Sequence, residues 1–552
     1  MTTTQGAEEM RPFAITLEVG SSMNNLTGTW RSERPIYVDL LPPCNKQCPA
    51  GENIQKWLYH TEEGDYEAAW REIMVNNPLP AVMGRVCYHS CQTACNRAQV
   101  DEAVGINSVE RFLGDKAISE GWKVEINAEP TGQKVLVVGS GPSGLSAAYH
   151  LALLGHDVTI RDQGDKPGGM MRYGIPSYRL PRDILDAEIQ RIADMGVTFE
   201  QGTLVTDVEE ALEEFDAVFT AVGAQIGKNV NVPAAEASKI MDAVDVLRDV
   251  EEGGTATGDE RPLLGRRVVV YGGGNTAVDA ARTAKRLGAT ESVILYRRTR
   301  DRMPAHDSEV TEAEEEGITM RWLSTVNHVD EETIKIEKME LDENGFPQPT
   351  GEYEELAADS LIMALGQESD LSLLDGVEGI EIEWGNVKVS PQMMTGREGV
   401  FAGGDMVPSE KNVTVAIGHG KKAARYIDSW LRGGTYTPPE KHGDATLDRM
   451  ETWYYSDAPA KIRKRLEGAR RSSTFDEVVI GLDEESAIFE ARRCMSCGNC
   501  FGCDNCFGVC PDNAVEKIAS GVYEFKYDYC KGCGVCAAEC PCGAITMVPE
   551  EI

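Results

Sequence analysis

Two cysteine runs near the C-terminus share one spacing. Each run has four cysteines followed by a proline: Cys500, Cys503, Cys506, Cys510 and Pro511, then Cys530, Cys533, Cys536, Cys540 and Pro541. The pattern C-x2-C-x2-C-x3-C-P gathers thiolates in a tight loop and predicts 4Fe-4S clusters. A zinc ribbon also uses C-x2-C pairs, but two matching runs that end in Cys-Pro favour iron over zinc. The spacing therefore predicts a chain that transfers single electrons.

The two runs resemble those of bacterial two-cluster ferredoxins, in which each cluster takes three cysteines from one run and the last from the other. The resemblance implies two ligand sets: Cys500, Cys503, Cys506 with Cys540, and Cys530, Cys533, Cys536 with Cys510. We expect an α+β dicluster ferredoxin domain over residues 491–552.

Length and composition set the outer limits. A chain of 552 residues has room for about three or four domains. The formal charge of -36 disfavours binding to nucleic acid or to an anionic membrane surface; it could favour a basic redox partner or reflect a solvated surface. The sequence contains no run of 18 or more apolar residues, so we expect no membrane span. The opening MTTTQGAEEM does not resemble a signal peptide. Sixteen cysteines with metal-type spacing indicate the reducing cytoplasm.

A dinucleotide-binding fingerprint lies in the middle of the chain. The apolar run 134–138 predicts a buried parallel strand, and a helical pattern follows from Leu145. Between them stands G-x-G-x-x-G, in which the glycines allow a tight turn, approach to a pyrophosphate, and close packing of helix on strand. The next strand ends at Asp162, the position expected for an acid that binds ribose. The candidate binding residues are Gly139, Gly141, Pro142, Ser143, Gly144 and Asp162.

A second fingerprint follows the strand 267–271. It contains Gly272, Gly274, Asn275 and Thr276, and Ala277 takes the third glycine position. The strand after it ends in Arg297 and Arg298 rather than in an acid. Guanidinium groups at this point suit a 2′-phosphate, so the sequence favours NADP(H) over NAD(H); the alternative is a solvated basic turn.

A third segment, Gly399 to Asp405, predicts a strand that ends in Gly404 and Asp405, followed by a helix that begins near Thr414 and Val415. With the first fingerprint, it resembles the two-dinucleotide-domain flavoproteins of the pyridine-nucleotide disulfide reductase type. The resemblance implies FAD, with the NAD(P) domain inserted into a split FAD domain. It also adds Gly169, Met170 and Gly223 as cofactor contacts, and it marks 217–223 and 360–366 as the segments where the chain leaves and re-enters the FAD domain.

Residues 96–493 contain no cysteine. A disulfide reductase of this fold needs a redox-active cysteine pair beside its flavin, and this chain has none there. Electrons must therefore pass from flavin to the iron–sulfur clusters, because flavin links two-electron nicotinamide to one-electron carriers. No catalytic acid or base is required, and His419 is expected to pack or to hydrogen-bond rather than to titrate.

The N-terminal cysteines are Cys44, Cys48, Cys87, Cys91 and Cys95. With GSGPSG, KPGGM, GGGNTAVD and FAGGD, this block resembles the iron–sulfur domain of glutamate synthase small subunits and of dihydropyrimidine dehydrogenase over residues 35–432. Members with two N-terminal clusters carry a further C-x2-C upstream, which is missing here. We therefore expect one cluster, on Cys48, Cys87, Cys91 and Cys95, with Cys44 spare. A different set including Cys44, or a glutamine ligand to a second cluster, are alternatives.

The expected fold is α/β, with two Rossmann-like domains between two iron–sulfur domains. The expected parts are a helical N-terminal iron–sulfur domain (1–130), the FAD domain (131–228 and 360–432), the NAD(P) domain (229–359), a loosely packed linker (433–490) and the ferredoxin domain (491–552). Three further cysteines, Cys494, Cys497 and Cys542, lie outside these ligand sets. They are expected either to form a small metal knuckle or to be free thiols.

This layout resembles the NAD(P)H-linked electron-transfer subunits of multi-subunit oxidoreductases. The resemblance implies a hetero-oligomer whose partner is a catalytic subunit, for instance a thiamine-diphosphate 2-oxoacid (aryl-glyoxylate) oxidoreductase, or a soluble ferredoxin. One alternative is a glutamate synthase small subunit. The other is a wiring or assembly subunit without nicotinamide turnover, which the intact second fingerprint disfavours.

Overall fold

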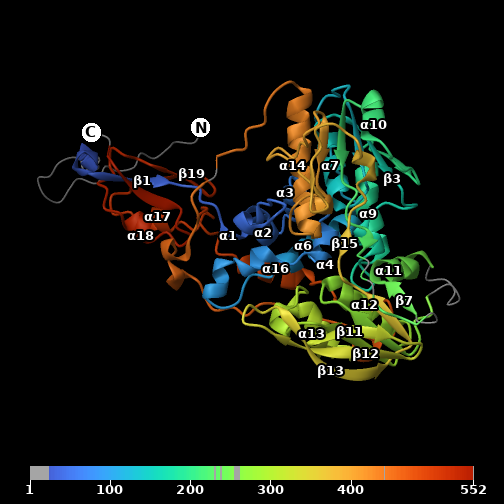
Figure 1. Cartoon of the computed structure of the whole chain (residues 1–552). Helices are drawn as coiled ribbons and strands as arrows, with labels where there is room; N and C mark the ends of the chain where they lie inside the picture. Colours follow the sequence, from blue (N-terminus) through green and yellow to red (C-terminus); the bar gives the residue numbers. More distant parts are fainter. Residues whose placement is uncertain are drawn as a thin grey trace, which may run out of the picture.

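The computed structural model describes residues 24–228, 230, 232–235, 239–253, 262–440 and 442–550. The polar opening segment of the sequence lies outside the described residues. Figure 1 shows the C-terminal unit on one side of the molecule and the two dinucleotide-binding units on the other, with N-terminal helices between them. Within the described ranges, no helix combines the length and apolar character needed to cross a membrane.

The N-terminal unit is helical, as predicted. Its main helices are α2 (Ile54–Glu62), α3 (Tyr66–Met74), α4 (Pro80–Val86) and α6 (Ile106–Glu120). Their apolar faces bury Trp57 and Trp70 completely. Two short helices, α1 (Pro43–Gln47) and α5 (Ser90–Thr93), carry the first cysteines. The helices therefore form a core that holds the cysteine-bearing turns on its surface.

The first sheet is parallel, in the order β18-β5-β2-β3-β4. Its strands are β2 (Lys134–Val138), β3 (Asp157–Asp162), β4 (Thr198–Gln201), β5 (Ala217–Thr220) and β18 (Val400–Ala402). The helices associated with it are α7 (Pro142–Leu153), α8 (Met170–Tyr173), α9 (Arg182–Ala193), α10 (Val208–Glu214) and α14 (Val413–Leu431). Because β18 pairs with β5 across a long insertion, this unit is split in sequence, as the resemblance implied.

The second sheet is also parallel, in the order β10-β9-β8-β14-β7. Its strands are β7 (Ile240–Asp242), β8 (Arg267–Tyr271), β9 (Glu291–Tyr296), β10 (Thr319–Trp322) and β14 (Ser360–Met363). Its helices are α11 (Ala243–Glu252), α12 (Asn275–Arg286) and α13 (Asp307–Glu315), and an antiparallel sheet of β11 (Ser324–Val329), β12 (Thr333–Leu341) and β13 (Pro347–Ala357) covers it.

One predicted boundary is wrong. The segment from residue 360 was assigned to the FAD domain, but β14 pairs with β8 and β7 of the second sheet. The chain returns to the first unit only after this strand, through the short strands β15 (Gln367–Glu368), β16 (Ile382–Glu383) and β17 (Asn386–Val387). β15 pairs with β6 (Ile226–Gly227) on the outgoing crossover. The two crossovers therefore run side by side.

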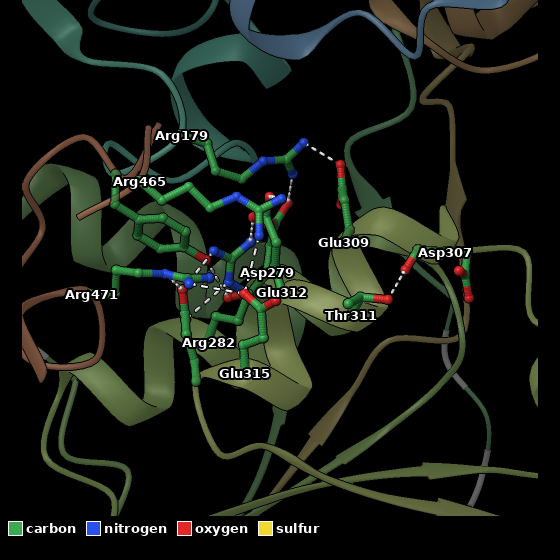
Figure 2. Close-up of polar contacts among 12 residues, drawn as sticks. Arg179, Asp279, Arg282, Asp307, Glu309, Thr311, Glu312, Glu315, Arg465 and Arg471 are labelled. Carbon is green, nitrogen blue, oxygen red and sulfur yellow. Dashed lines mark hydrogen bonds and ion pairs between the residues drawn. The ribbon is translucent and has the colours of Figure 1, made fainter. Parts of the chain in front are cut away.

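The segment 433–490 is not loosely packed. Arg465 and Arg471 reach α13, where they form ion pairs with Glu312 and Glu315 at 3.0–3.2 Å. Figure 2 shows these arginines approaching the same helix that Arg179, from the first unit, contacts through Glu309. Further along, Glu477 pairs with Arg85 and Arg111 of the N-terminal unit at 2.8 and 2.9 Å. The segment is thus a strap that joins the N-terminal unit to the second sheet.

The strap ends in α15 (Gly468–Arg471) and α16 (Glu484–Arg492), and Asp483 caps α16 by accepting from Ser486 N. The C-terminal unit follows, with α17 (Asn505–Val509), β19 (Val515–Ala519), β20 (Val522–Phe525), α18 (Val535–Ala538) and β21 (Ile545–Pro549). Its last strand pairs with β1 (Glu33–Tyr37) near the start of the chain. Both ends of the described chain therefore meet in this unit.

Beside the strap, the side chain of Glu316 is fully buried. It accepts from Arg282 and Arg286, each at 2.7 Å and each also with a buried side chain. Burial raises the pKa of Glu316, but the hydrogen bonds from the two arginines lower it more, so the net pKa lies below its ordinary value. The carboxylate therefore stabilises the fold above the unfolded pKa of about 4.3, and this contribution is lost as pH falls through the lower folded pKa.

Glu316→Gln leaves Arg282 and Arg286 without their buried countercharge. We expect a loss of roughly 3–5 kcal/mol in the free energy of unfolding and a lower urea midpoint, followed by intrinsic fluorescence. Glu314→Gln is the matched control, because Glu314 pairs with Arg300 at the half-exposed surface and its loss should cost less than about 1 kcal/mol. Equal midpoints for the two variants would contradict this reading of the network.

Candidate functional site

One large cavity receives both fingerprints. Gly139, Gly141 and Ser143 line it from the turn between β2 and α7, and Gly274, Asn275 and Thr276 line it from the turn between β8 and α12. The other predicted cofactor residues on its wall are Pro142, Asp162, Gly169, Met170, Gly223, Gly404 and Asp405. Two nucleotides bound to the two turns would therefore share one hollow, which hydride exchange between their reactive rings requires.

The first turn forms a cradle without side chains. A Cβ on Gly141 would meet nothing within 4 Å, whereas a Cβ on Gly404 would lie 3.1 Å from Ser143 Cβ. Ser143 Oγ is buried and has no hydrogen-bond partner among the described residues. An open cradle with an unpartnered hydroxyl at a helix N-terminus fits the phosphates of FAD.

The carboxylates beside the cradle are positioned by backbone and by burial. Asp162 Oδ2 accepts from Ser140 N at 2.6 Å, and its Oδ1 accepts from Gly164 N at 2.7 Å. Burial raises the pKa of Asp405, while Lys411 partly offsets this shift. His419 Nδ1 accepts from Gly404 N at 3.2 Å, and burial lowers the pKa of His419. His419 is therefore a hydrogen-bonding residue, as predicted.

Six predicted residues do not line the cavity. They are Gly144, Gly272, Arg297, Arg298, Thr414 and Val415. Gly144 serves packing, because a Cβ there would lie 1.9 Å from Gly139 O, and Gly272 (φ 154°) lets the turn pass Ala364 O at 2.2 Å from the Cβ position. Val415 N donates to the capping Asn412 Oδ1 at 2.9 Å.

The two arginines of the second fingerprint lie at the end of β9. Arg297 is exposed and Arg298 half-buried. Arg298 Nε is shielded from solvent and has no hydrogen-bond partner in the described part of the chain. By contrast, Arg300 is engaged by Asp307 and Glu314 at 2.7 and 2.8 Å. Arg297 and Arg298 thus remain the guanidinium groups at this turn that an anionic ligand could engage.

The N-terminal cysteines approach this cavity through Cys87. Thr414 Oγ1, near the start of α14, donates to Cys87 Sγ at 3.3 Å, and the neighbouring residue Tyr88 lies on the cavity wall. Tyr88 OH accepts from Asn275 Nδ2 at 2.6 Å, and its ring stacks on His306 at 3.7 Å. Sequence analysis does not single out Tyr88, because no motif marks an aromatic side chain that follows a metal-ligand cysteine.

The structure does not bring the four predicted N-terminal ligands together. Cys48, Cys87 and Cys91 lie near one another around Glu110, which is 6 % exposed. Burial, and then the charge of Glu110, raise the pKa of Cys87 to about 11. Cys95 instead lines a separate hollow with Cys44, Cys494 and Cys497. The predicted ligand set is therefore divided, because Cys95 lies apart from the other three cysteines. Cys44, which was expected to be spare, lies with Cys95.

Two small hollows in the C-terminal unit gather the remaining cysteines. One is lined by Cys500, Cys503, Cys506 and Cys540, with Cys542 beside them, and the other by Cys510, Cys530, Cys533 and Cys536. These groups are the crossed sets that the ferredoxin spacing implied. Ala544 N donates to Cys540 Sγ at 3.3 Å and Ala514 N to Cys510 Sγ at 3.2 Å. Four thiols with backbone donors to sulfur fit 4Fe-4S clusters.

Comparisons with known proteins agree with this site. The family model described as "Pyridine nucleotide-disulphide oxidoreductase" matches residues 133–420, more than half of the chain. Models described as "Dihydropyrimidine dehydrogenase domain II, 4Fe-4S cluster" and "4Fe-4S binding domain" match residues 28–122 and 523–546.

Three relatives show how far the likeness extends. The NADP(+)-dependent formate dehydrogenase subunit beta of Moorella thermoacetica is 36% identical over 82% of this chain and 70% of its own length. The NADPH-Fe(3+) oxidoreductase subunit beta of Geobacter sulfurreducens is 34% identical over 82% and 75%. The small chain of glutamate synthase [NADPH] of Azospirillum brasilense is 34% identical over 72% and 88%.

The two matched iron–sulfur models lie on either side of the dinucleotide-binding region. The cysteine groups of the structure lie in the same two flanking parts of the chain. The chain is thus an NAD(P)H-dependent FAD oxidoreductase with 4Fe-4S domains on either side. It belongs to the pyridine nucleotide-disulphide oxidoreductase family.

Proposed function

We propose that this chain is the NADP(H)-linked electron-transfer subunit of a larger oxidoreductase, in the reducing cytoplasm. One observation carries the proposal: both fingerprints line a single cavity whose wall continues into the cysteine-bearing N-terminal turn. Between residues 96 and 493 the sequence has no cysteine. The flavin site therefore has no dithiol outlet of its own, and the cysteine groups on its flank are the available route.

The division of labour follows from the residues. When bound, FAD supplies the exchange between hydride and single electrons. The cradle is formed by Gly141, Gly169 and Gly404, which have no side chains, so phosphate can approach the N-terminus of helix α7. Gly274 leaves the corresponding space open at α12. The protein's task here is to bind and to orient two nucleotides, and no proton transfer by a side chain is needed.

For the N-terminal cluster, we assign Cys48, Cys87 and Cys91 as thiolate ligands. Glu110 is a candidate for the fourth ligand, because its buried carboxyl group lies among these three thiols. Asn77 Nδ2 donates to Glu110 Oε1 at 2.9 Å and fixes the carboxyl. The ferredoxin-like sets in the C-terminal unit hold two further clusters.

The partner follows from the relatives only as a class. The Moorella relative is a subunit of a formate dehydrogenase, and the Geobacter relative is a subunit of an NADPH-Fe(3+) oxidoreductase. We propose a hetero-oligomer in which a separate subunit performs the substrate chemistry, for instance a 2-oxoacid oxidoreductase. A glutamate synthase small subunit is the second candidate, favoured by the Azospirillum relative, which is matched over 88% of its length.

The function is tested with purified, anaerobic protein. NADPH should bleach the flavin absorbance, and the reduced protein should then reduce a viologen dye. A wiring subunit without nicotinamide turnover predicts no bleaching by NADPH, although dithionite would still reduce the flavin. That result would overturn the proposal.

Two glycine variants separate the nucleotide sites. Gly141→Ala adds a methyl group to the FAD cradle without striking any protein atom, so the protein should fold but lose most of its bound flavin. Gly274→Ala should retain flavin and raise the KM for NADPH by about tenfold or more, since about 1.4 kcal/mol of binding corresponds to tenfold. Gly468→Ala, also in open space, is the control. Equal flavin content in Gly141→Ala and the control would contradict the assignment of the cradle.

The arginines after β9 should select the nicotinamide nucleotide. Arg297→Ala with Arg298→Ala removes two cationic groups that suit a 2′-phosphate, so we expect kcat/KM for NADPH to fall about tenfold or more while that for NADH changes little. Arg300→Ala is the control, because Arg300 is already held by two carboxylates. A parallel loss for both nucleotides would show that these arginines do not read the phosphate.

A further inference from the structure

Four cysteines from opposite ends of the sequence line one hollow. Cys44 lies on α1 and Cys95 follows α5, whereas Cys494 and Cys497 follow α16. Most of the remaining lining is apolar, including Pro42, Pro43, Leu58, Val104 and Ile106. None of these four thiols has a role in the sites assigned so far. Their convergence over more than 400 residues of sequence calls for an explanation.

The hollow matches the two predicted cluster sites in size. Its empty volume is about 360 Å³, compared with about 300 and 330 Å³ for the two hollows of the C-terminal unit. Those two are lined by the cysteine sets whose spacing indicates 4Fe-4S clusters. The third hollow therefore offers the same number of thiol ligands around a space of the same scale.

Sulfur-directed hydrogen bonds add to the likeness. Ser496 N donates to Cys494 Sγ at 3.5 Å, and Asn96 Nδ2 approaches Cys497 Sγ at 3.5 Å. Corresponding backbone donors reach Cys510 and Cys540 in the C-terminal unit. Hydrogen bonds to cluster sulfurs are one of the means by which a protein tunes a cluster's potential.

The turn that carries Cys494 and Cys497 is fixed to the N-terminal unit. Glu490, with no exposed surface, accepts from Gly105 N at 2.7 Å and from Arg493 Nη1 at 3.0 Å. Arg493 Nη2 donates to Glu102 O at 2.6 Å and to Asp101 Oδ1 at 3.2 Å. Gln55 Nε2, from α2, donates to Ser496 Oγ at 2.7 Å. The two halves of the thiol set are therefore held at fixed separation.

We propose that Cys44, Cys95, Cys494 and Cys497 ligate a further 4Fe-4S cluster, shared between the N-terminal unit and the segment after α16. This inference rests on the proposed function in one respect, since it assumes that the chain carries iron–sulfur clusters. It makes the C-x2-C pair at 494–497 a ligand pair rather than free thiols.

The position of this site suits a cluster that relays electrons. On one side, Cys44 and Cys95 pack against the same apolar core as Cys48 and Cys91. On the other side, Cys497 stands three residues before Cys500, the first ligand of the C-terminal sets. Gly498 N donates to Cys542 O at 2.7 Å, which joins the turn to the C-terminal unit. The proposed cluster thus lies between the flavin-side thiols and the ferredoxin-like sets, where it can relay electrons singly.

The test removes the C-terminal half of the ligand set. In Cys494→Ala with Cys497→Ala, iron and acid-labile sulfide should each fall by about four per chain relative to the unaltered protein. One component of the EPR spectrum of the dithionite-reduced protein should disappear. Ser472→Ala with Ser473→Ala is the matched control, because it is also a double replacement by alanine, lies at an exposed part of the strap and keeps all four thiols. Its iron content should be unchanged.

The electron route provides a second measurement. The double variant should still bleach its flavin with NADPH, yet transfer to the clusters of the C-terminal unit should be slowed by at least tenfold. If the double variant does not fold, Cys497→Ser alone decides the question. A serine oxygen can take one ligand position on iron, so this variant should keep its iron with a shifted EPR component.

Each contrary outcome is distinct. Unchanged iron and an unchanged EPR spectrum in the variants would overturn the shared cluster while leaving the proposed function intact. Loss of about one zinc per chain in place of iron would also overturn it, because four thiolates equally suit a structural zinc ion. Absence of iron from the unaltered protein would overturn the proposed function itself.

Discussion

A buried ion pair at the end of α16, between Glu490 and Arg493, anchors this helix and the turn after it to the N-terminal unit through contacts with residues 101–105. Removing two charges from water is costly, and such a pair is tolerable only when its remaining hydrogen-bonding groups are satisfied. Here Glu490 also accepts from backbone N–H of Gly105, and Arg493 also donates to the carbonyls of Ala103 and Ala458 at 2.9 and 2.7 Å. The network therefore fixes α16 on α2 and α6. This contact fixes the turn that carries Cys494 and Cys497.

A fixed arrangement matters because the nucleotide cavity and the groups of thiols lie next to one another in sequence-distant parts of the chain. The nucleotide cavity lies against Cys87 through Thr414, and the N-terminal thiols lie against the hollow shared by Cys44 and Cys494. The pairing of β1 with β21 secures the C-terminal unit independently of the strap. These attachments, which bridge several hundred residues of sequence, turn separate modules into one connected body. Figure 1 shows this body with the C-terminal unit and the nucleotide-binding units at opposite sides.

Much of the fold could be predicted because its signals are local. A strand, a glycine turn and a helix occur within 20 residues at both fingerprints, and local sterics determine how each glycine is used. The crossed cysteine sets of the C-terminal unit also follow from a repeated short spacing. By contrast, the boundary predicted at residue 360 is wrong because β14 is buried along its whole length, and such a strand suits either parallel sheet.

The remaining errors concern long-range packing. The arginine-rich strap has the composition of a solvated linker, and only the folded chain shows that Arg471 meets Glu315 and that Glu477 meets Arg85. The predicted N-terminal ligand set is divided in the structure: Cys91 and Cys95 are only four residues apart in sequence, but of these two only Cys95 lines the hollow that it shares with Cys44. A spacing motif cannot show this, since half of the cysteines that line this hollow come from the far end of the chain. The C-x2-C pair at 494–497 can be recognised in the sequence, but its proximity to Cys44 and Cys95 cannot.

The proposed function requires nicotinamide and the iron–sulfur clusters to exchange electrons within this one chain. The most direct measurement starts from protein reduced with dithionite, freed of excess reductant and mixed anaerobically with NADP+. We expect the EPR signals of the reduced clusters to decay as NADPH forms, with one electron pair lost from the protein for each NADPH produced. Clusters that stay reduced while the flavin alone is reoxidised would contradict it.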